Sequence, residues 1–417
     1  MASALRVVLC VVYNPMANVS SDMARHWNHG ARFFDATFMS AIDPPLYQLY
    51  LSALRWLSSD HPLTIGLATG LLSATMPWLY YRAARELGLE QVPARLAWLL
   101  LAIAPSLLTV YSFFLHSTLL MALMGLGLWM SARHLRKLDR PSWLWSALVW
   151  TLAILTKRTA LPVATICLAV GWWKGSRRPT DLVLAAAVMA ALLIPNAIRS
   201  HSILGFPAPV GSGVISHTNF VSGARTIRIQ WNGNENYHYA SPSSFQYPLS
   251  PLSDWQIRTA REDSEVQVTA WAHHGWVDWQ RALDAIPFAP ERWLERWGEN
   301  ILLYLFAPAW PEAMGTSAIG ELNRAFRWVW APLTMIVLAG NAWWFARHRR
   351  LHLIPLATTV LALSLLFQNS YPMEGRYRKP VEPLLLLNAV WLCQPRPGAR
   401  KTDIRARTGQ QPAGAAT

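Results

Sequence analysis

The sequence predicts an all-α polytopic membrane protein, a bundle of transmembrane helices with two extracytoplasmic loops. The chain of 417 residues is 53% hydrophobic and only 14% charged, and its mean hydropathy is +0.19. Its apolar residues also form long runs that contain no charge. An ordinary soluble domain carries about 25% charged residues. The composition therefore excludes a typical soluble enzyme, and it equally excludes a disordered chain.

The apolar runs give the order of the predicted helices, since a spanning helix needs ~20 mostly apolar residues. We expect about ten spans of this kind. The long run 96–132 is expected to hold two helices with a turn near His116, and Lys157-Arg158 is expected to separate two shorter helices. The apolar segment 301–311 is too short to cross a membrane. The runs are 7–21, 62–81, 96–132, 141–156, 159–173, 182–198, 328–346, 351–373 and 383–395.

Basic residues orient these helices. Lys and Arg outnumber Asp and Glu in the connections 82–95, 133–140, 174–181 and 347–350, and Arg6 adds to this side. Cytoplasmic loops carry such an excess, which explains the net charge of +14 without a nucleic-acid partner. The predicted parts are a transmembrane module with its first external loop (1–199, loop 18–61), an extracytoplasmic loop with interfacial helices (200–322), C-terminal transmembrane helices (323–395) and a disordered basic cytoplasmic tail (396–417).

Most acidic residues fall in the two long loops on the other side. A transporter usually keeps its loops short and its polar groups in mid-membrane. Polar groups gathered in external loops instead indicate a reaction at the outer membrane face.

The first of these loops supplies two candidate catalytic carboxylates. Asp22 follows the first apolar run, where a partly desolvated carboxylate can act as a base on a hydroxyl or amine. Asp43 precedes Pro44-Pro45, which keeps it out of helical geometry and places the start of the next helix. Either carboxylate can instead be a helix cap, which leaves both interpretations open.

Two basic segments are candidates to bind an anionic substrate. Lys157 and Arg158 interrupt apolar sequence, which implies a partner, a wet cavity or a position at headgroup depth. The segment from Glu374 through Arg376, Tyr377 and Arg378 to Pro380 is cationic on the outer side. An arginine there can clamp a phosphate, or it can form an ion pair with Glu374 or Glu382.

Other site types find no support in the sequence. Three cysteines are too few and too scattered for a disulfide framework. The histidines show no repeated metal spacing, and neither a Walker-type loop nor a GxGxxG motif is present. We therefore expect no metal and no cofactor.

Several segments in order resemble the GT-C glycosyltransferases, in particular relatives of protein O-mannosyltransferases and of the aminoarabinose transferase that modifies lipid A. The resemblance touches most of the chain, from about residue 20 to 392. The matching segments are Asp22, the Pro-Pro-Leu-Tyr at 44–47, residues 155–161, Ile194 to Arg199 with 204–212 and Asn219, and Glu374 to Pro380. The sequence departs from the family pattern at Met23, where members often have a second acidic residue, and at the turn 115–118.

The resemblance implies a GT-C-like bundle and a polyprenyl-phosphate-linked sugar as donor, without a further cofactor. It implies transfer to a lipid, glycan or protein acceptor at the outer face of an inner (plasma) membrane, with Asp22 as general base. Lys157 and the segment from Arg376 to Arg378 would hold the phosphate leaving group. Arg158, Glu374 and Tyr377 would also belong to the substrate-binding site. Membrane lipids would surround the enzyme. Two alternatives remain: a transporter or flippase of lipid-linked sugars, and a non-catalytic envelope assembly protein.

Overall fold

The computed structural model describes most of the chain and leaves several segments aside. The described residues are 2–19, 21–31, 33, 43–175, 177–204, 207–211, 226–231, 234–240, 265–270, 294, 298, 301–302, 304–306, 318–366 and 375–394. The predicted tail 396–417 lies outside them, and so do most of the residues 200–322 in which interfacial helices were expected.

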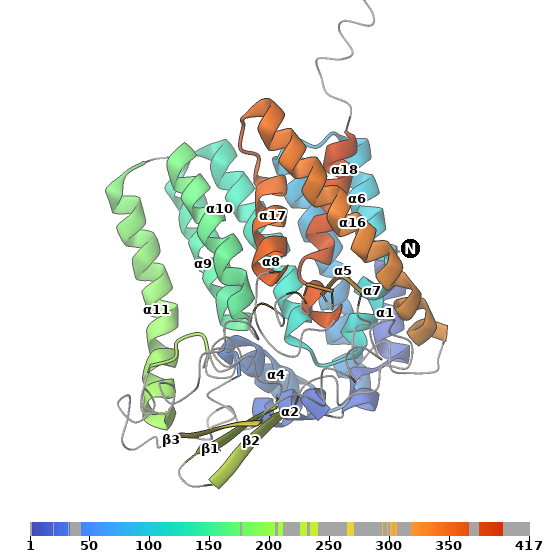
Figure 1. The fold of residues 1–417 in the computed structure, drawn as a ribbon, viewed down its shortest axis with the longest axis vertical. Coiled ribbons are helices and arrows are strands. Elements are labelled where there is room, and N and C mark those ends of the chain that lie inside the picture. Colours follow the sequence, from blue (N-terminus) through green and yellow to red (C-terminus); the bar gives the residue numbers. More distant parts are fainter. Residues whose placement is uncertain are drawn as a thin grey trace, which may run out of the picture.

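Helices make up the body of the molecule, as predicted. Figure 1 shows the long helices running side by side, with α2 and α4 lying across one end of the bundle. The α-helices are α1 (Ala2–Val12), α2 (Ser21–Ala31), α4 (Pro45–Ser58), α5 (Pro62–Glu86), α6 (Gln91–Ile103), α7 (Pro105–Thr109), α8 (His116–Lys137), α9 (Arg140–Thr156), α10 (Leu161–Lys174), α11 (Pro179–Leu204), α16 (Ala318–His348), α17 (Leu353–Leu366) and α18 (Glu382–Cys393).

Short 3-10 turns and three strands complete the described structure. The turns are η1 (Pro15–Asn18), η2 (Val110–Ser112), η3 (Arg158–Ala160) and η6 (Gly375–Arg378). Strand β1 (Thr226–Trp231) pairs antiparallel with β2 (Asn234–Ala240) and parallel with β3 (Glu265–Ala270), in the order β2-β1-β3. These strands lie within the large loop between α11 and α16, for which the sequence predicted no strand.

The count of ten spans is not confirmed. Among the described residues, two helices are long and apolar enough to cross a membrane: Pro179–Ile203 and Gly320–His348. A third span results if α6 and the segment Pro105–Ser112, bent by 61°, are taken together. Helices such as α10, α17 and α18 have only 14, 14 and 12 residues, short of the ~20 that a complete span needs.

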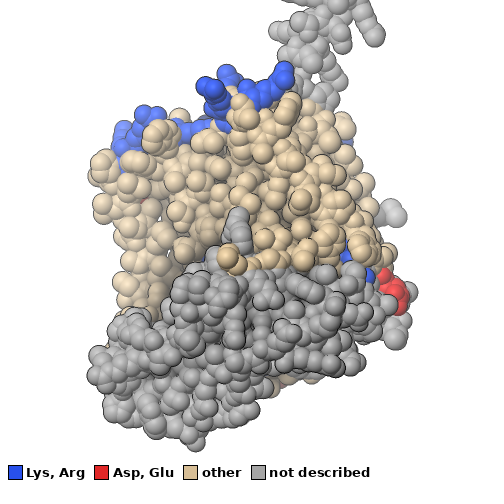
Figure 2. All heavy atoms as spheres, in the orientation of Figure 1, with Lys and Arg blue, Asp and Glu red and all other residues tan. Residues whose placement is uncertain are grey.

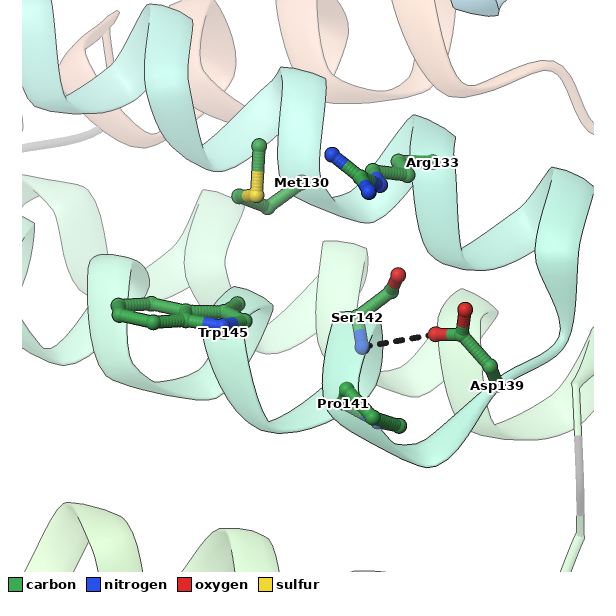
Figure 3. Close-up of a pocket in the computed structure, with 6 residues that line it drawn as sticks. All are labelled: Met130, Arg133, Asp139, Pro141, Ser142 and Trp145. Carbon is green, nitrogen blue, oxygen red and sulfur yellow. Dashed lines mark hydrogen bonds between the residues drawn. The ribbon is translucent and has the colours of Figure 1, made fainter.

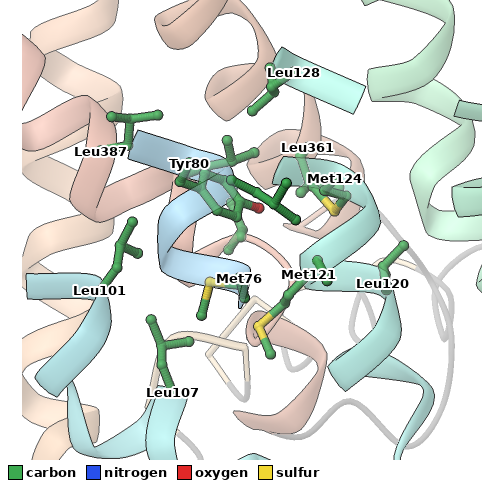
Figure 4. Packing of buried hydrophobic residues seen from close by; sticks show 14 of the residues in the cluster. Met76, Tyr80, Leu101, Leu107, Leu120, Met121, Met124, Leu128, Leu361 and Leu387 are labelled. Carbon is green, nitrogen blue, oxygen red and sulfur yellow. The ribbon is translucent and has the colours of Figure 1, made fainter. Parts of the chain in front are cut away.

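Close helix packing forms the core (Figure 4). Tyr80 of α5 and Leu128 of α8 are fully buried beside Leu361 of α17 and Leu387 of α18. Small residues allow the helices to approach: a Cβ added at Gly125 would lie 2.9 Å from the Tyr80 ring. Helices α5, α8, α17 and α18 therefore share one continuous apolar core.

Arg6 was expected at the cytoplasmic surface, and this expectation is wrong. Its side chain is fully buried in the bundle, where Nε donates to the carbonyl and hydroxyl oxygens of Ser73, half-way along α5. Figure 2 shows many lysines and arginines gathered at one end of the bundle. This end, which we call the basic end, is formed by the last turns of α8, α10 and α16, the connections that follow them and the first residue of α9 (Figure 1). These segments carry Arg133, Arg136, Lys137, Arg140, Lys174, Arg177, Arg178, Arg347, Arg349 and Arg350.

Candidate functional site

Asp43 ties helix α2 to the start of α4, at the end of the bundle opposite the basic end. Its carboxylate is buried, with one oxygen 3.6 Å from Nη2 of Arg25 and the other 3.7 Å from Nδ1 of His26. Pro44 has extended backbone angles and α4 begins at Pro45, as the Pro-Pro pair predicted. The sequence alone did not predict that Asp43 would face two side chains of α2.

Aromatic side chains extend this cluster to the turn before α8. The ring of His26 lies 5.6 Å from that of Tyr47 and 5.4 Å from that of His116. Sequence reasoning had placed neither His26 nor Tyr47 in the site. The position of His116 at the start of a helix within a long apolar run was the available signal. Asp43, His26, Tyr47 and His116 form one cluster from three chain segments: α2, the start of α4 and the start of α8.

Asp22 lies on the same helix as two residues of this cluster. Position 22 is in the first turn of α2, one helical turn before His26. The side chain of Asp22 lies outside the described part of the structure. The backbone alone thus places the candidate base on the helix that Asp43 contacts.

Lys157 and Arg158 break the chain between α9 and α10, as predicted. Lys157 has extended backbone angles, with φ −164° and ψ 125°, and ends α9, while Arg158 is half-buried in η3. The Lys157 side chain is 7% exposed, and its ammonium lies 4.8 Å from the centre of the Tyr377 ring. The structure therefore brings these two candidate residues together across more than half of the chain.

The rest of the second basic segment is held by a buried ionic network. Arg378 Nε donates to Glu382 Oε1 at 3.2 Å, and its Nη1 donates to the carbonyl oxygens of Tyr304 and Leu305. Lys379 and the Ser106 hydroxyl approach the other carboxylate oxygen, at 3.9 and 2.8 Å. The sequence had left two alternatives for Arg378, a contact with phosphate or an ion pair with Glu382. The structure shows the ion pair with Glu382. Glu374 and the side chain of Arg376 lie outside the described residues.

An apolar groove of about 400 Å³ lies between α4, α9 and α11. Pro45, two residues after Asp43, and Leu155, two residues before Lys157, both line it. The remaining lining residues are Phe33, Leu46, Leu49, Leu152, Ala191, Leu192, Pro195, Asn196 and Arg199. The groove therefore lies beside the two segments that carry Asp43 and Lys157, but neither of these side chains lines it.

Two polar side chains of α11 give this groove a polar end. Arg199 is half-buried, stacks over the Phe33 ring at 4.6 Å and donates to the Phe33 carbonyl oxygen at 2.9 Å. Asn196 donates to the carbonyl oxygens of Ala208 and Pro209. One cation at the end of an apolar groove suits an amphiphile that has a single anionic head. Sequence reasoning did not select Arg199, although a cation directly after the apolar run 182–198 was visible.

The comparisons with known proteins agree with this geometry. Residues 43–198 match the sequence model of a family described as dolichyl-phosphate-mannose-protein mannosyltransferase. The match supports a membrane glycosyltransferase of the GT-C type. The matched residues include Asp43, Lys157, Arg158 and most of the groove lining. They do not include Asp22, Arg199 or the segment from Glu374 to Arg378. A search of curated proteins gives no match to the chain.

Proposed function

We propose that the protein transfers a sugar from a polyprenyl-phosphate carrier to a hydroxyl or amine of a lipid, glycan or protein acceptor. The reaction would take place at the outer face of an inner membrane. The observation that carries this proposal is the apolar groove with Arg199 among its lining residues, beside the segments that carry Asp43 and Lys157. An isoprenoid chain needs an apolar channel, and its phosphate needs a cation where the channel ends.

In the proposed reaction, an acceptor oxygen or nitrogen attacks the anomeric carbon while the bond from that carbon to the phosphate oxygen breaks. Asp22 takes the proton of the acceptor, and the polyprenyl phosphate leaves with the bonding electron pair. Attack from the face opposite the phosphate inverts the anomeric configuration. Asp43 would be the second acidic group, and its contacts with Arg25 and His26 would hold α2 in place.

Cations would stabilise the leaving group in this scheme. Negative charge develops on the phosphate as the bond breaks, and fixed positive groups in a partly dry site stabilise it more than water does. Lys157, held against Tyr377, and Arg158 are proposed for this role, together with Arg376. Glu374 is an anion and would take no part in it. Arg378 would contribute indirectly, because its buried network fixes the turn that carries Tyr377.

The first experiment tests chemistry separately from binding. We expect Asp22→Asn to bind polyprenyl phosphate as the wild type does. When it is incubated with a polyprenyl-phosphate sugar and membrane extract, however, the variant should no longer release free polyprenyl phosphate. Asp60→Asn is the matched control, since Asp60 is exposed and pairs only with Arg55 among described residues. Undiminished release by Asp22→Asn would favour a flippase or a scaffold. Lipid and glycan profiles of cells with and without the gene would identify donor and acceptor.

A second experiment tests the groove. Leu155→Trp fills it, so retention of undecaprenyl phosphate measured by native mass spectrometry should fall at least about tenfold, a change of ~1.4 kcal/mol. Leu161→Trp is the control, because Leu161 is 48% exposed and does not line the groove. Equal retention by the two variants would show that the carrier binds elsewhere.

A further inference from the structure

A second pocket lies at the basic end, between the last turn of α8 and the first turns of α9. It has a volume of about 290 Å³ and is lined by Met130, Arg133, Asp139, Pro141, Ser142 and Trp145. Figure 3 shows Met130 and Arg133 on one helix, facing Ser142 and Trp145 on the other across the pocket. The groove described above contacts the opposite end of α9, at Leu152 and Leu155. The two cavities are therefore separate.

One cation and one anion face this pocket. Two arginines near the pocket, but outside its lining, form ion pairs with other carboxylates: Arg136 with Glu86 at 2.9 Å and Arg140 with Asp181 at 2.8 Å. Arg133 and Asp139 are the charged residues that line the pocket itself. The lining of the pocket thus offers one cation and one carboxylate, and Lys137 adds a further positive charge near Asp139.

Asp139 is fixed in position and ionised. It is the N-cap of α9, where Oδ1 accepts a hydrogen bond from the Ser142 N–H at 2.8 Å. Hydrogen bonds from the side chain and backbone of Ser142 lower the pKa of this carboxyl. A carboxylate has about four lone-pair sites, so it can accept from a ligand while it caps the helix.

The remaining walls are typical of a lipid-facing position. Trp145 is 57% exposed and Met130 is half-buried. Tryptophan side chains are enriched where hydrocarbon meets the head groups, and the basic end marks such a boundary. A ligand here would place polar groups between Arg133 and Asp139, and apolar groups against Trp145 and Met130.

We propose that this pocket binds the head group of phosphatidylethanolamine, a phospholipid with a phosphate and a primary ammonium. The phosphate pairs with Arg133, the ammonium donates to Asp139, and the first carbons of the acyl chains lie against Met130 and Trp145. Opposite charges on neighbouring helices match a zwitterion better than they match an anionic lipid, because Asp139 repels a second negative charge. This site is independent of the proposed glycosyl transfer.

The test measures which phospholipid the purified full chain retains in native mass spectrometry. Phosphatidylethanolamine, phosphatidylcholine and phosphatidylglycerol with the same acyl chains are compared. Phosphatidylcholine has the same phosphate, but its quaternary ammonium lacks the N–H donors that Asp139 would accept. We expect wild type to retain phosphatidylethanolamine about two- to fivefold more strongly than either of the others, the range of a partly exposed charge pair.

Two variants and one control decide the assignment. Asp139→Asn keeps a good N-cap but removes the charge, so it should abolish the preference for phosphatidylethanolamine and leave the fold intact. Arg133→Gln should weaken retention of all three lipids. Arg136→Gln, one turn further along α8 and outside the pocket, should change nothing. The proposal is overturned if wild type prefers phosphatidylglycerol, if Asp139→Asn keeps the preference, or if Arg136→Gln matches Arg133→Gln.

Discussion

The carboxylate of Glu382 is buried between two cations, Arg378 and Lys379, and also accepts from Ser106. Glu382→Gln keeps the size and polarity of the side chain but removes the charge that faces both cations. Breaking a buried pair in this way costs ~3–5 kcal/mol, so the melting temperature in detergent should fall clearly. Glu86→Gln is the control: its partner Arg136 is exposed, and such pairs contribute ~0–1 kcal/mol. Equal melting temperatures for the two variants would contradict this assignment.

His352 predicts a pH dependence. It lies in the connection between α16 and α17, where Nε2 faces the Leu87 carbonyl oxygen, Nδ1 accepts from the Ile354 N–H, and the ring stacks on Trp391. Burial lowers its pKa from 6.5 to about 4. The fold therefore favours the neutral ring. Its contribution to stability is fully present above pH 6.5 and is lost as the pH falls toward 4.

We expect the melting temperature of the wild type to drop between pH 7 and pH 5 more than that of His352→Gln, which has no proton to gain. His61→Gln, at an exposed residue, should follow the wild-type curve. Parallel curves for wild type and His352→Gln would show that this ring does not set the acid sensitivity.

Single residues show what sequence patterns can and cannot reveal at a site. The Lys157-Arg158 break and the helix start after Pro44 follow from local rules, and both are confirmed. The contacts of Lys157 with Tyr377 and of Asp43 with α2 join distant segments, which a pattern in one chain cannot report. Whether Arg378 would contact a phosphate or Glu382 likewise depended on tertiary packing, which the sequence does not show.

At the scale of elements, the bend between α6 and α7 depends on a residue from α1. Pro105 interrupts the helix, and the two halves meet at 61°. The carbonyl oxygens near the bend accept from Arg6, whose Nη1 donates to Leu101 and Ala102 and whose Nη2 donates to Leu107. A guanidinium offers five donors, so one side chain can satisfy several carbonyls that the bend removes from the helical ladder.

Replacing Arg6 by methionine should therefore destabilise the fold. Each buried carbonyl left without its donor costs ~1–3 kcal/mol, so Arg6→Met should lower the melting temperature more than Arg6→Lys, which keeps the charge and some donors. Arg95→Met, at an exposed position of α6, serves as control. A melting temperature for Arg6→Met equal to that of Arg95→Met would mean that the bend is held by packing alone.

Elements differ in how well the sequence predicts them. The start of α8 at His116 and the end of α9 before Lys157 match the predicted boundaries, because a polar residue interrupts an apolar run at each. The three strands within residues 226–270 were not predicted. Their pairing depends on contacts between segments up to about 40 residues apart, and Gly-, Asn- and Ser-rich sequence gives little periodic signal.

For the whole molecule, composition predicted a helical membrane protein, while the count of ten spans is not confirmed by the described residues. Charge-free runs report where a chain is apolar, and a core buried in protein is as apolar as a segment in lipid. Leu361 of α17 and Leu387 of α18, for example, are fully buried within the bundle. The proposed outer-face reaction therefore depends on orientation, which the basic end predicts independently of the span count.

Orientation is tested by cysteine labelling in a Cys393→Ser background, since Cys10 and Cys167 are buried. His61 and Leu138 are exposed at opposite ends of the bundle: α5 begins after His61, and α8 ends before Leu138 beside the Arg136–Glu86 pair. Because cations favour the cytoplasmic side, an impermeant thiol reagent should label His61→Cys on intact cells and Leu138→Cys only after lysis. The reverse pattern would place the Asp43 cluster and the groove end at Arg199 on the cytoplasmic side, where the proposed external acceptor cannot reach them.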